Sequence, residues 1–107
     1  MAFDEVLAER IREAAGDAPL VEKRMFGGLA FLLEGNMAVG VHADDLIVRV
    51  AKADWPALLE EPGAKVFDMT GRPMSGWLLV SGDVLDDHVL ATWVGRGVAY
   101  ARSLPPK

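Results

Sequence analysis

The spacing of hydrophobic side chains changes along the chain, and the changes separate helical segments from strands. In residues 3–15 apolar side chains recur at helical spacing, with polar side chains on the opposite face. Asp4 and Glu5 stand near the start, where the helix dipole favours negative charge, and Pro19 prevents the helix from continuing. We therefore expect an amphipathic helix whose apolar stripe consists of Phe3, Val6, Leu7, Ile11 and Ala14 or Ala15.

Strand-forming residues dominate positions 24–50, which we take as the centre of the fold. Residues 20–26 predict a first short strand, and Gly27 with Gly28 allows a bend before the next strand begins at Leu29. After the apolar run 29–33, Gly35-Asn36 suits a two-residue hairpin turn. That turn predicts a register with three facing pairs: Leu32 and Val39, Phe31 and Gly40, and Ala30 and Val41.

The turn at residues 42–45 leaves two alternatives, and they differ in where they put Arg49. A three-residue loop pairs Val39 with Arg49 and places the arginine on the face opposite Phe31. A two-residue loop puts Arg49 opposite Gly40, with its guanidinium on the Phe31 side. In the first case Phe31, Val48 and Val50 meet the helices, and Leu32, Val39 and Arg49 share the other face.

The second half of the chain predicts two helices and one strand. Residues 52–61 read as a short helix with Asp54 as its cap and Pro56 in its first turn. The stretch 63–76 is an irregular connection anchored by Val66, Phe67 and Met69, and residues 76–81 form the last strand. The last helix starts at Gly82-Asp83 or Asp86-Asp87 and runs to about Leu104, and Gly95 and Gly97 indicate close packing.

These segments predict one α+β domain over residues 1–107, in the order α-β-β-β-β-α-β-α. A single antiparallel sheet of about five strands is covered by helices mainly on one face. Such a sheet leaves a second apolar face. If Leu32, Val39, Val41 and Ile47 share that face, we expect it to bind a protein partner or a second copy of the chain.

Composition narrows the function. Of the 107 residues, 51% are hydrophobic, which excludes intrinsic disorder, and no apolar run approaches the ~20 residues that cross a bilayer. The net charge of −5 argues against direct nucleic-acid binding, which needs clustered Lys and Arg. The chain has no cysteine, and its N-terminus lacks the basic start of a secretory signal, so we expect a cytoplasmic protein.

Motifs of catalysis are not found. The sequence has no phosphate-binding glycine loop and no serine in a nucleophile-elbow context. His42 with Asp44 and Asp45 resembles a set of metal ligands, as does His88 with Asp86 and Asp87. Turn formation and the helix dipole also explain both sets, and we favour that interpretation over a metal site. We predict no catalytic residue, no cofactor and no metal.

Four basic residues lie near the predicted sheet or its covering loop: Lys23, Arg24, Arg49 and Arg72. One interpretation is structural, with ion pairs to Asp68, Glu34 or Glu22, or guanidinium groups that reach solvent. The other is functional, with an anion-binding hollow for a carboxylate or phosphate that the Arg72 loop closes.

Several blocks carry a family resemblance: KRMFGGLAFLLEGNMAVGV, then LIVRV, TGRPMSGWLLV and WVGRGVAYARSLP. Together they resemble the N-terminal domain of the TfoX/Sxy family. The most specific parts are the Met25–Gly28 block, the Asn36-Met37 turn, Arg49 and Gly71-Arg72-Pro73-Met74.

The resemblance implies a compact α+β domain with an antiparallel sheet and no catalytic residues. It implies a co-regulator of natural competence and transcription rather than an enzyme. Full-length competence regulators also carry a C-terminal helical domain, so we expect a stand-alone copy of the N-terminal one. The residues that we expect to bind a ligand or a protein partner are Lys23, Arg24, Phe26, Asn36, Arg49 and Arg72.

Overall fold

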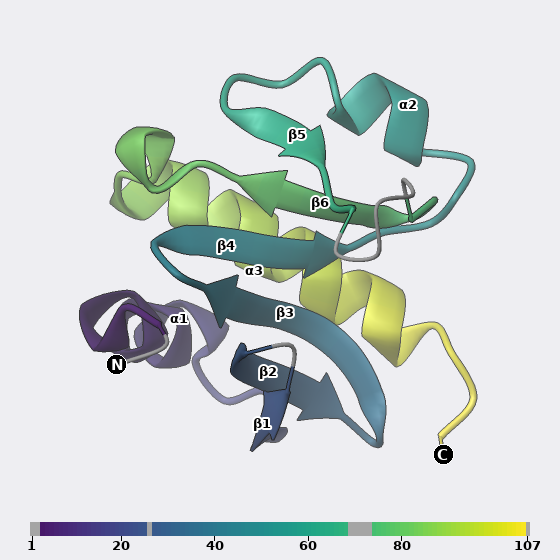
Figure 1. Cartoon of the computed structure of the whole chain (residues 1–107). Helices are drawn as coiled ribbons and strands as arrows, with labels where there is room; N and C mark the ends of the chain where they lie inside the picture. The colour runs from purple at the N-terminus through teal and green to yellow at the C-terminus, as the bar shows by residue number, and fades with distance from the viewer. Residues whose placement is uncertain (1–2, 26, 69–73, 107) are drawn as a thin grey trace.

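The structure, a computed structural model, describes residues 3–25, 27–68 and 74–106. It contains an antiparallel sheet of six strands in the order β1-β2-β3-β4-β6-β5. Along the chain the elements are α1 (Glu5–Ala15), β1 (Leu20–Met25), β2 (Gly28–Leu33), β3 (Asn36–His42), β4 (Asp45–Arg49), α2 (Trp55–Leu58), β5 (Ala64–Val66), β6 (Trp77–Val80), the 3-10 helix η1 (Gly82–Val84) and α3 (Asp87–Arg102) (Figure 1). The predicted α+β class is confirmed, with β5 as one strand more than expected.

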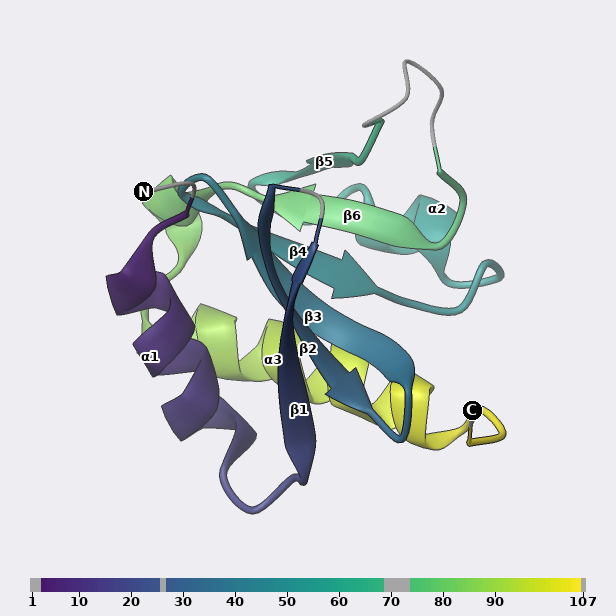
Figure 2. The ribbon, with the colours of Figure 1, turned by 60° about the horizontal axis from the view of Figure 1, so that its bottom comes forward.

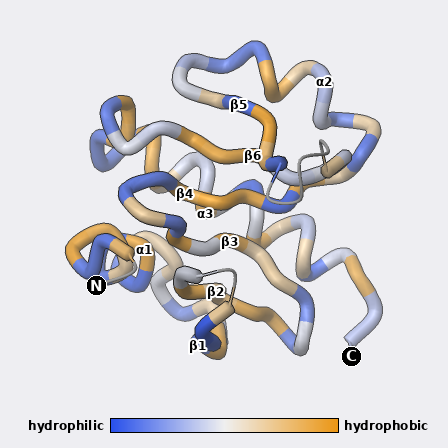
Figure 3. Tube along the Cα trace, in the orientation of Figure 1, coloured by the Kyte–Doolittle hydropathy of each residue, from blue (hydrophilic) through white to orange (hydrophobic). Residues whose placement is uncertain are grey.

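Side chains alternate between two faces of the sheet, and each face has its own core. The helix face packs against α1 and α3, which lie side by side along it (Figure 2). We call the opposite side the second face; its buried residues are Ala30, Met37, Ile47 and Phe67. Hydrophobic residues accordingly predominate along β4 and β6 (Figure 3).

Helix α1 begins where the sequence predicts, but its buried stripe is narrower. The side chain of Asp4 accepts hydrogen bonds from the backbone N–H groups of Val6 and Leu7 and so caps the helix. Leu7, Ala8 and Ile11 are buried, whereas Val6 is 70% exposed. The assignment of Val6 to the apolar stripe is therefore wrong, because the face of α1 that contacts α3 and β3 does not extend to it.

The β2–β3 hairpin turns one position earlier than predicted. Its loop is Glu34-Gly35, with φ angles of 51° and 85°, and Leu33 pairs with Asn36. A bulge between Phe31 and Leu32 then shifts the pairing. The predicted register is wrong: Phe31 faces Val39, Leu32 faces Met37, and Ala30 faces Gly40.

The β3–β4 loop has two residues, Ala43-Asp44, and gives neither pairing anticipated for Arg49. His42 pairs with Asp45 and Val39 with Val48, while Arg49 pairs with Trp77 on its other side. Arg49 still lies on the second face, as the three-residue alternative expected, because it alternates with Val48 and Val50 of the helix face.

Two valines were assigned to the wrong face. Val39 and Val41 pack against the helices, as Phe31, Val48 and Val50 do, and all five are buried. Leu32 and Ile47 belong to the second face, as predicted. The bulge beside Leu32 shifts the β2–β3 register, so Val39 comes to face Phe31 instead of Leu32.

Helix α3 fits closely under the centre of the sheet. Asp86 caps it by accepting a hydrogen bond from the backbone N–H of Val89 at 2.8 Å, so the second of the two predicted starts is confirmed. A Cβ on Gly97 would lie 2.4 Å from the backbone oxygen of Ala38, whereas one on Gly95 would meet nothing within 4 Å. The prediction of close packing is therefore confirmed for Gly97 and is wrong for Gly95.

Helix α2 is shorter than predicted and stands at the edge of the helix face. Asp54 occupies its N-cap position, but the Asp54 side chain makes no capping hydrogen bond. The indole nitrogen of Trp55 donates to the backbone oxygen of Trp77 at 2.9 Å and so ties α2 to β6. Of the predicted anchors, Phe67 is buried, Val66 is half-buried, and Met69 lies outside the described residues.

Candidate functional site

The four basic residues singled out from the sequence do not form one cluster within the described part of the chain. Lys23 pairs with Ala30 and is exposed on the second face. Arg24 pairs with Leu29 on the helix face, where its guanidinium carbon lies 5.8 Å from the ring centroid of Phe3. Arg49 lies on the second face, and Arg72 lies outside the described residues, as does Phe26.

Arg24 stands in acidic surroundings. It lines a hollow of about 360 Å³ between α1 and β1 together with Arg12 and the carboxylates of Glu5, Glu9 and Glu22. Arg12 forms an ion pair with Glu9 and two hydrogen bonds of 2.6 Å with the carboxylate of Glu22. These hydrogen bonds hold the pKa of Glu22 below its ordinary value and raise the pKa of Arg12. An anion entering this hollow would meet three carboxylates.

Arg49 has a different environment, made of aromatic rings. Its guanidinium carbon lies 5.2 Å from the ring centroid of Trp77 and 5.5 Å from that of Tyr100, and the residue is half-buried. Within the described residues its guanidinium makes no hydrogen bond and no ion pair. Of the alternatives considered for the basic residues, an ion pair with Asp68, Glu34 or Glu22 is therefore wrong for Arg49 within the described residues, where the guanidinium lies over two rings.

Asn36 plays a structural part in the described fold. The residue is 2% exposed, and its side-chain nitrogen donates a hydrogen bond of 2.9 Å to the backbone oxygen of Pro105. This bond fastens the segment after α3 to the start of β3. It accounts for a buried asparagine at this position, and any role in binding stays a prediction.

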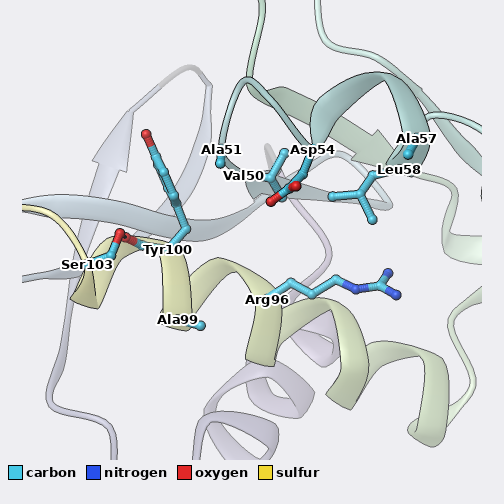
Figure 4. A pocket seen from close by; sticks show the side chains of 9 residues that line it. All are labelled: Val50, Ala51, Asp54, Ala57, Leu58, Arg96, Ala99, Tyr100 and Ser103. Carbon is cyan, nitrogen blue, oxygen red and sulfur yellow. Dashed lines mark hydrogen bonds between the residues drawn. The ribbon is translucent and has the colours of Figure 1, made fainter.

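A second, larger hollow that the sequence did not predict lies between α2 and α3. It measures about 540 Å³ and is lined by Val50, Ala51, Asp54, Ala57, Leu58, Arg96, Ala99, Tyr100 and Ser103 (Figure 4). Tyr100 stands at one end of this hollow and Arg96 at the other, with the Asp54 carboxylate between them (Figure 4). Most of the lining is apolar, and Tyr100 is the residue that this hollow shares with the surroundings of Arg49.

Arg96 is already neutralised at its end of the hollow. Its two terminal nitrogens donate to the two carboxylate oxygens of Glu61 at 3.0 and 3.1 Å. Its guanidinium carbon also lies 4.6 Å from the ring centroid of Trp93. Arg49, one residue before Val50 of the lining, has no such acidic partner within the described residues.

The acidic residues near the two histidines serve the fold. Asp45 accepts a hydrogen bond from the backbone N–H of Gly82 at 3.1 Å and forms an ion pair of 3.2 Å with Lys65. Asp86 caps α3, and Asp87 forms an ion pair with Arg10. Within the described residues no three His, Cys, Asp or Glu side chains converge as metal ligands. In that same part of the chain, no helix has the length and apolar character needed to cross a bilayer.

Fold and site together define a small α+β protein, built on one antiparallel sheet with helices on one face, whose notable polar feature is a stacked arginine. The chain belongs to the TfoX N-terminal domain family, because the model of that family matches residues 13–101. Neither a curated protein nor a solved structure matches the chain.

Proposed function

We propose that this chain is a non-enzymatic regulatory domain that acts by binding a protein partner through the second face of its sheet. Membership of the TfoX N-terminal domain family supports a regulatory role. By the resemblance of its motifs, we extend the proposal to a co-regulator of transcription and of competence. The location of the proposed binding surface is inferred from the apolar and charged residues of the second face.

The second face presents apolar side chains that no helix covers in the described part of the chain. Val21 pairs with Leu32 on this face and is 63% exposed. The half-buried members of this face are Met25, Leu32, Met74, Trp77 and Leu79. An apolar patch of this kind next to an exposed edge strand is typical of a surface that binds another protein.

The charges of the same face favour an acidic partner. Its strand residues include the basic side chains of Lys23, Arg49 and Lys65 and one acidic side chain, Asp45, which is paired with Lys65. The chain as a whole carries a net charge of −5. A partner that presents acidic groups around an apolar centre therefore complements this face. A second copy of the chain would juxtapose basic groups, so a heterologous partner is favoured over a homodimer.

The test compares two exposed valines that differ in location. Val21 lies on the second face, and Val6, which is 70% exposed, lies on α1. We expect wild-type chain, tagged at either end, to retain a specific partner from host lysate, and V6E to retain the same partner. V21E should lose at least about nine-tenths of it, because an ion buried in an apolar interface costs more than about 1.4 kcal/mol.

Three results would count against the proposal. One is that no partner is recovered with either tag position; another is that V21E and V6E retain the same amount. The third is light scattering that shows a dimer of the wild-type chain which V21E dissociates, since this would assign the second face to self-association.

A further inference from the structure

Arg49 has hydrogen-bonding capacity that the described residues leave unused. A guanidinium that stacks on aromatic rings uses the faces of its plane, and its N–H donors point outward within that plane. The guanidinium carbon of Arg49 lies over the rings of Trp77 and Tyr100, at 5.2 and 5.5 Å from the two centroids, and the guanidinium makes no hydrogen bond within the described residues. Its planar fork therefore stays available to a carboxylate, whose two oxygens match the donors of arginine.

The apolar hollow between α2 and α3 supplies the second half of a binding site. Tyr100 lines this hollow, and its ring centroid lies 5.5 Å from the Arg49 guanidinium carbon. Arg49 is not itself a lining residue, so Tyr100 is the residue that links the hollow to the arginine. Val50, Ala51, Leu58 and Ala99 offer it an apolar wall. Ligand sites in proteins commonly combine such a wall with a few polar groups that fix orientation.

The charges around the hollow restrict the ligand to one negative group. Arg96 is neutralised by Glu61, whereas Arg49 has no acidic partner in the described structure. Asp54 lines the middle of the hollow with its carboxylate and makes no capping hydrogen bond. A second negative charge on the ligand would approach that carboxylate and be repelled.

We propose that Arg49 binds the carboxylate of a small apolar monocarboxylic acid, whose aromatic or aliphatic body lies against Tyr100 in the hollow between α2 and α3. This ligand site goes beyond the protein-binding role of the second face and does not depend on it. Arg24, whose guanidinium also lies over a ring, lacks these features because its hollow contains the carboxylates of Glu5, Glu9 and Glu22.

The first arm of the test varies the probe on the wild-type chain. Amide and indole NMR signals are followed during titration with 4-phenylbutyrate, with the neutral 4-phenylbutanamide and with the cationic 4-phenylbutylamine. We expect saturable shifts that centre on Trp77 and Tyr100, and affinity for the carboxylate at least about tenfold higher than for the amide, as for a hydrogen bond to a charged group. The D54N variant should bind the carboxylate more tightly.

The second arm varies the protein. R49Q should lower the affinity for 4-phenylbutyrate at least about tenfold. R24Q, which removes the same charge beside another ring, should bind 4-phenylbutyrate as tightly as wild type does. R49K keeps the charge without the planar fork, and it should fall between R49Q and wild type. It also serves as the test variant if R49Q fails to fold, which the dispersion of the amide signals reveals.

Several outcomes would overturn the inference. These are equal affinity for 4-phenylbutyrate and its amide, preference for the amine, undiminished binding by a folded R49Q or R49K, and equal losses in R24Q and R49Q. NMR shifts of the wild-type chain that do not saturate with 4-phenylbutyrate would also overturn the inference. None of these results bears on the V21E and V6E comparison, so the two proposals fail separately.

Discussion

Gly97 of α3 lies directly against Ala38 of β3, at a distance that leaves no room for a side chain. A Cβ at Gly97 would lie 2.4 Å from the Ala38 backbone oxygen and 2.7 Å from a methyl carbon of Val39. Helix α3 contacts β2, β3 and β4 in the middle of the sheet, and it approaches β3 closely at this point. The glycine is thus a packing requirement of the fold.

G97A should destabilise the protein. The added methyl group must push α3 away from the backbone of β3, and overpacking of this kind costs about 1–3 kcal/mol. That cost exceeds the gain of about 1 kcal/mol that alanine normally brings to a helix. Urea unfolding followed by circular dichroism measures the difference in the free energy of unfolding.

G95A is the matched control for this substitution. Gly95 belongs to the same helix and is exposed, and a Cβ added there would have no atom within 4 Å. Its replacement should stabilise the protein by about 0.5–1 kcal/mol. Equal effects of G95A and G97A would contradict the packing that we describe.

The ion pair between Arg12 and Glu22 should make a small, pH-dependent contribution to stability. The hydrogen bonds from Arg12 lower the pKa of Glu22, so the folded state binds a proton at this group less readily than the unfolded chain does. The contribution is therefore present above the unfolded pKa and is lost as the pH falls through the lower folded value. Because both side chains are more than one-third exposed, solvent screening limits the contribution to at most about 1 kcal/mol.

E22Q tests this expectation against E13Q. Both substitutions remove one negative charge, but the Glu13 side chain makes no ion pair within the described residues. At neutral pH, E22Q should lower the free energy of unfolding relative to E13Q, and the two should converge as the pH falls through the lowered pKa of Glu22. A difference that persisted in acid or was insensitive to salt would point to a cause other than the ion pair.

Patterning predicted the class of fold, because α1 and α3 carry apolar residues at helical spacing and strand-forming residues are concentrated at positions 24–50. It missed β5, since Ala64–Val66 is only three residues long and sits in a connection rich in glycine and proline. The register errors have a local cause. Asn36 has the residue type of a turn, but its side chain is buried and donates a hydrogen bond to the Pro105 backbone oxygen. The bulge, which the residue pattern does not indicate, then places Val39 on the helix face.

The candidate site was predictable only in part. Arg49 was conspicuous as a charged residue on an apolar strand, but its face stayed open, because the two loop lengths considered at residues 42–45 put it on opposite faces of the sheet. Its contact with Tyr100 depends on how far α3 reaches beneath the sheet, which spacing within either segment does not encode. The expected grouping with Arg24 fails for a simple reason: residues 24 and 49 alternate onto opposite faces of the sheet.

Two substitutions of Asn36 should distinguish the contribution of its hydrogen bond to stability from the effect of its burial. N36A removes the donor to the Pro105 backbone oxygen and should cost about 1 kcal/mol. N36D places a carboxylate in a site that is 2% exposed and beside a carbonyl oxygen, so it should cost about 3 kcal/mol or more at neutral pH.

The two Asn36 variants also differ in their response to acid. Burial raises the pKa of an introduced aspartate, so protonation favours the folded state and N36D should regain stability as the pH falls. N36A should show no such recovery relative to wild type. Urea unfolding at several pH values distinguishes them, and parallel pH profiles would show that the side chain is not buried against Pro105.

The Glu34-Gly35 turn offers a stabilising substitution. Glu34 has a φ angle of 51°, which is costly for a residue with a long side chain, whereas asparagine tolerates it and suits the first position of such a hairpin turn. E34N should therefore raise the free energy of unfolding by about 0.5–1 kcal/mol. E60N is the control, because Glu60 is an exposed turn residue without a positive φ angle. Thermal and urea unfolding should show a gain for E34N alone, and a similar gain in E60N would assign it to the loss of negative charge in this acidic chain instead.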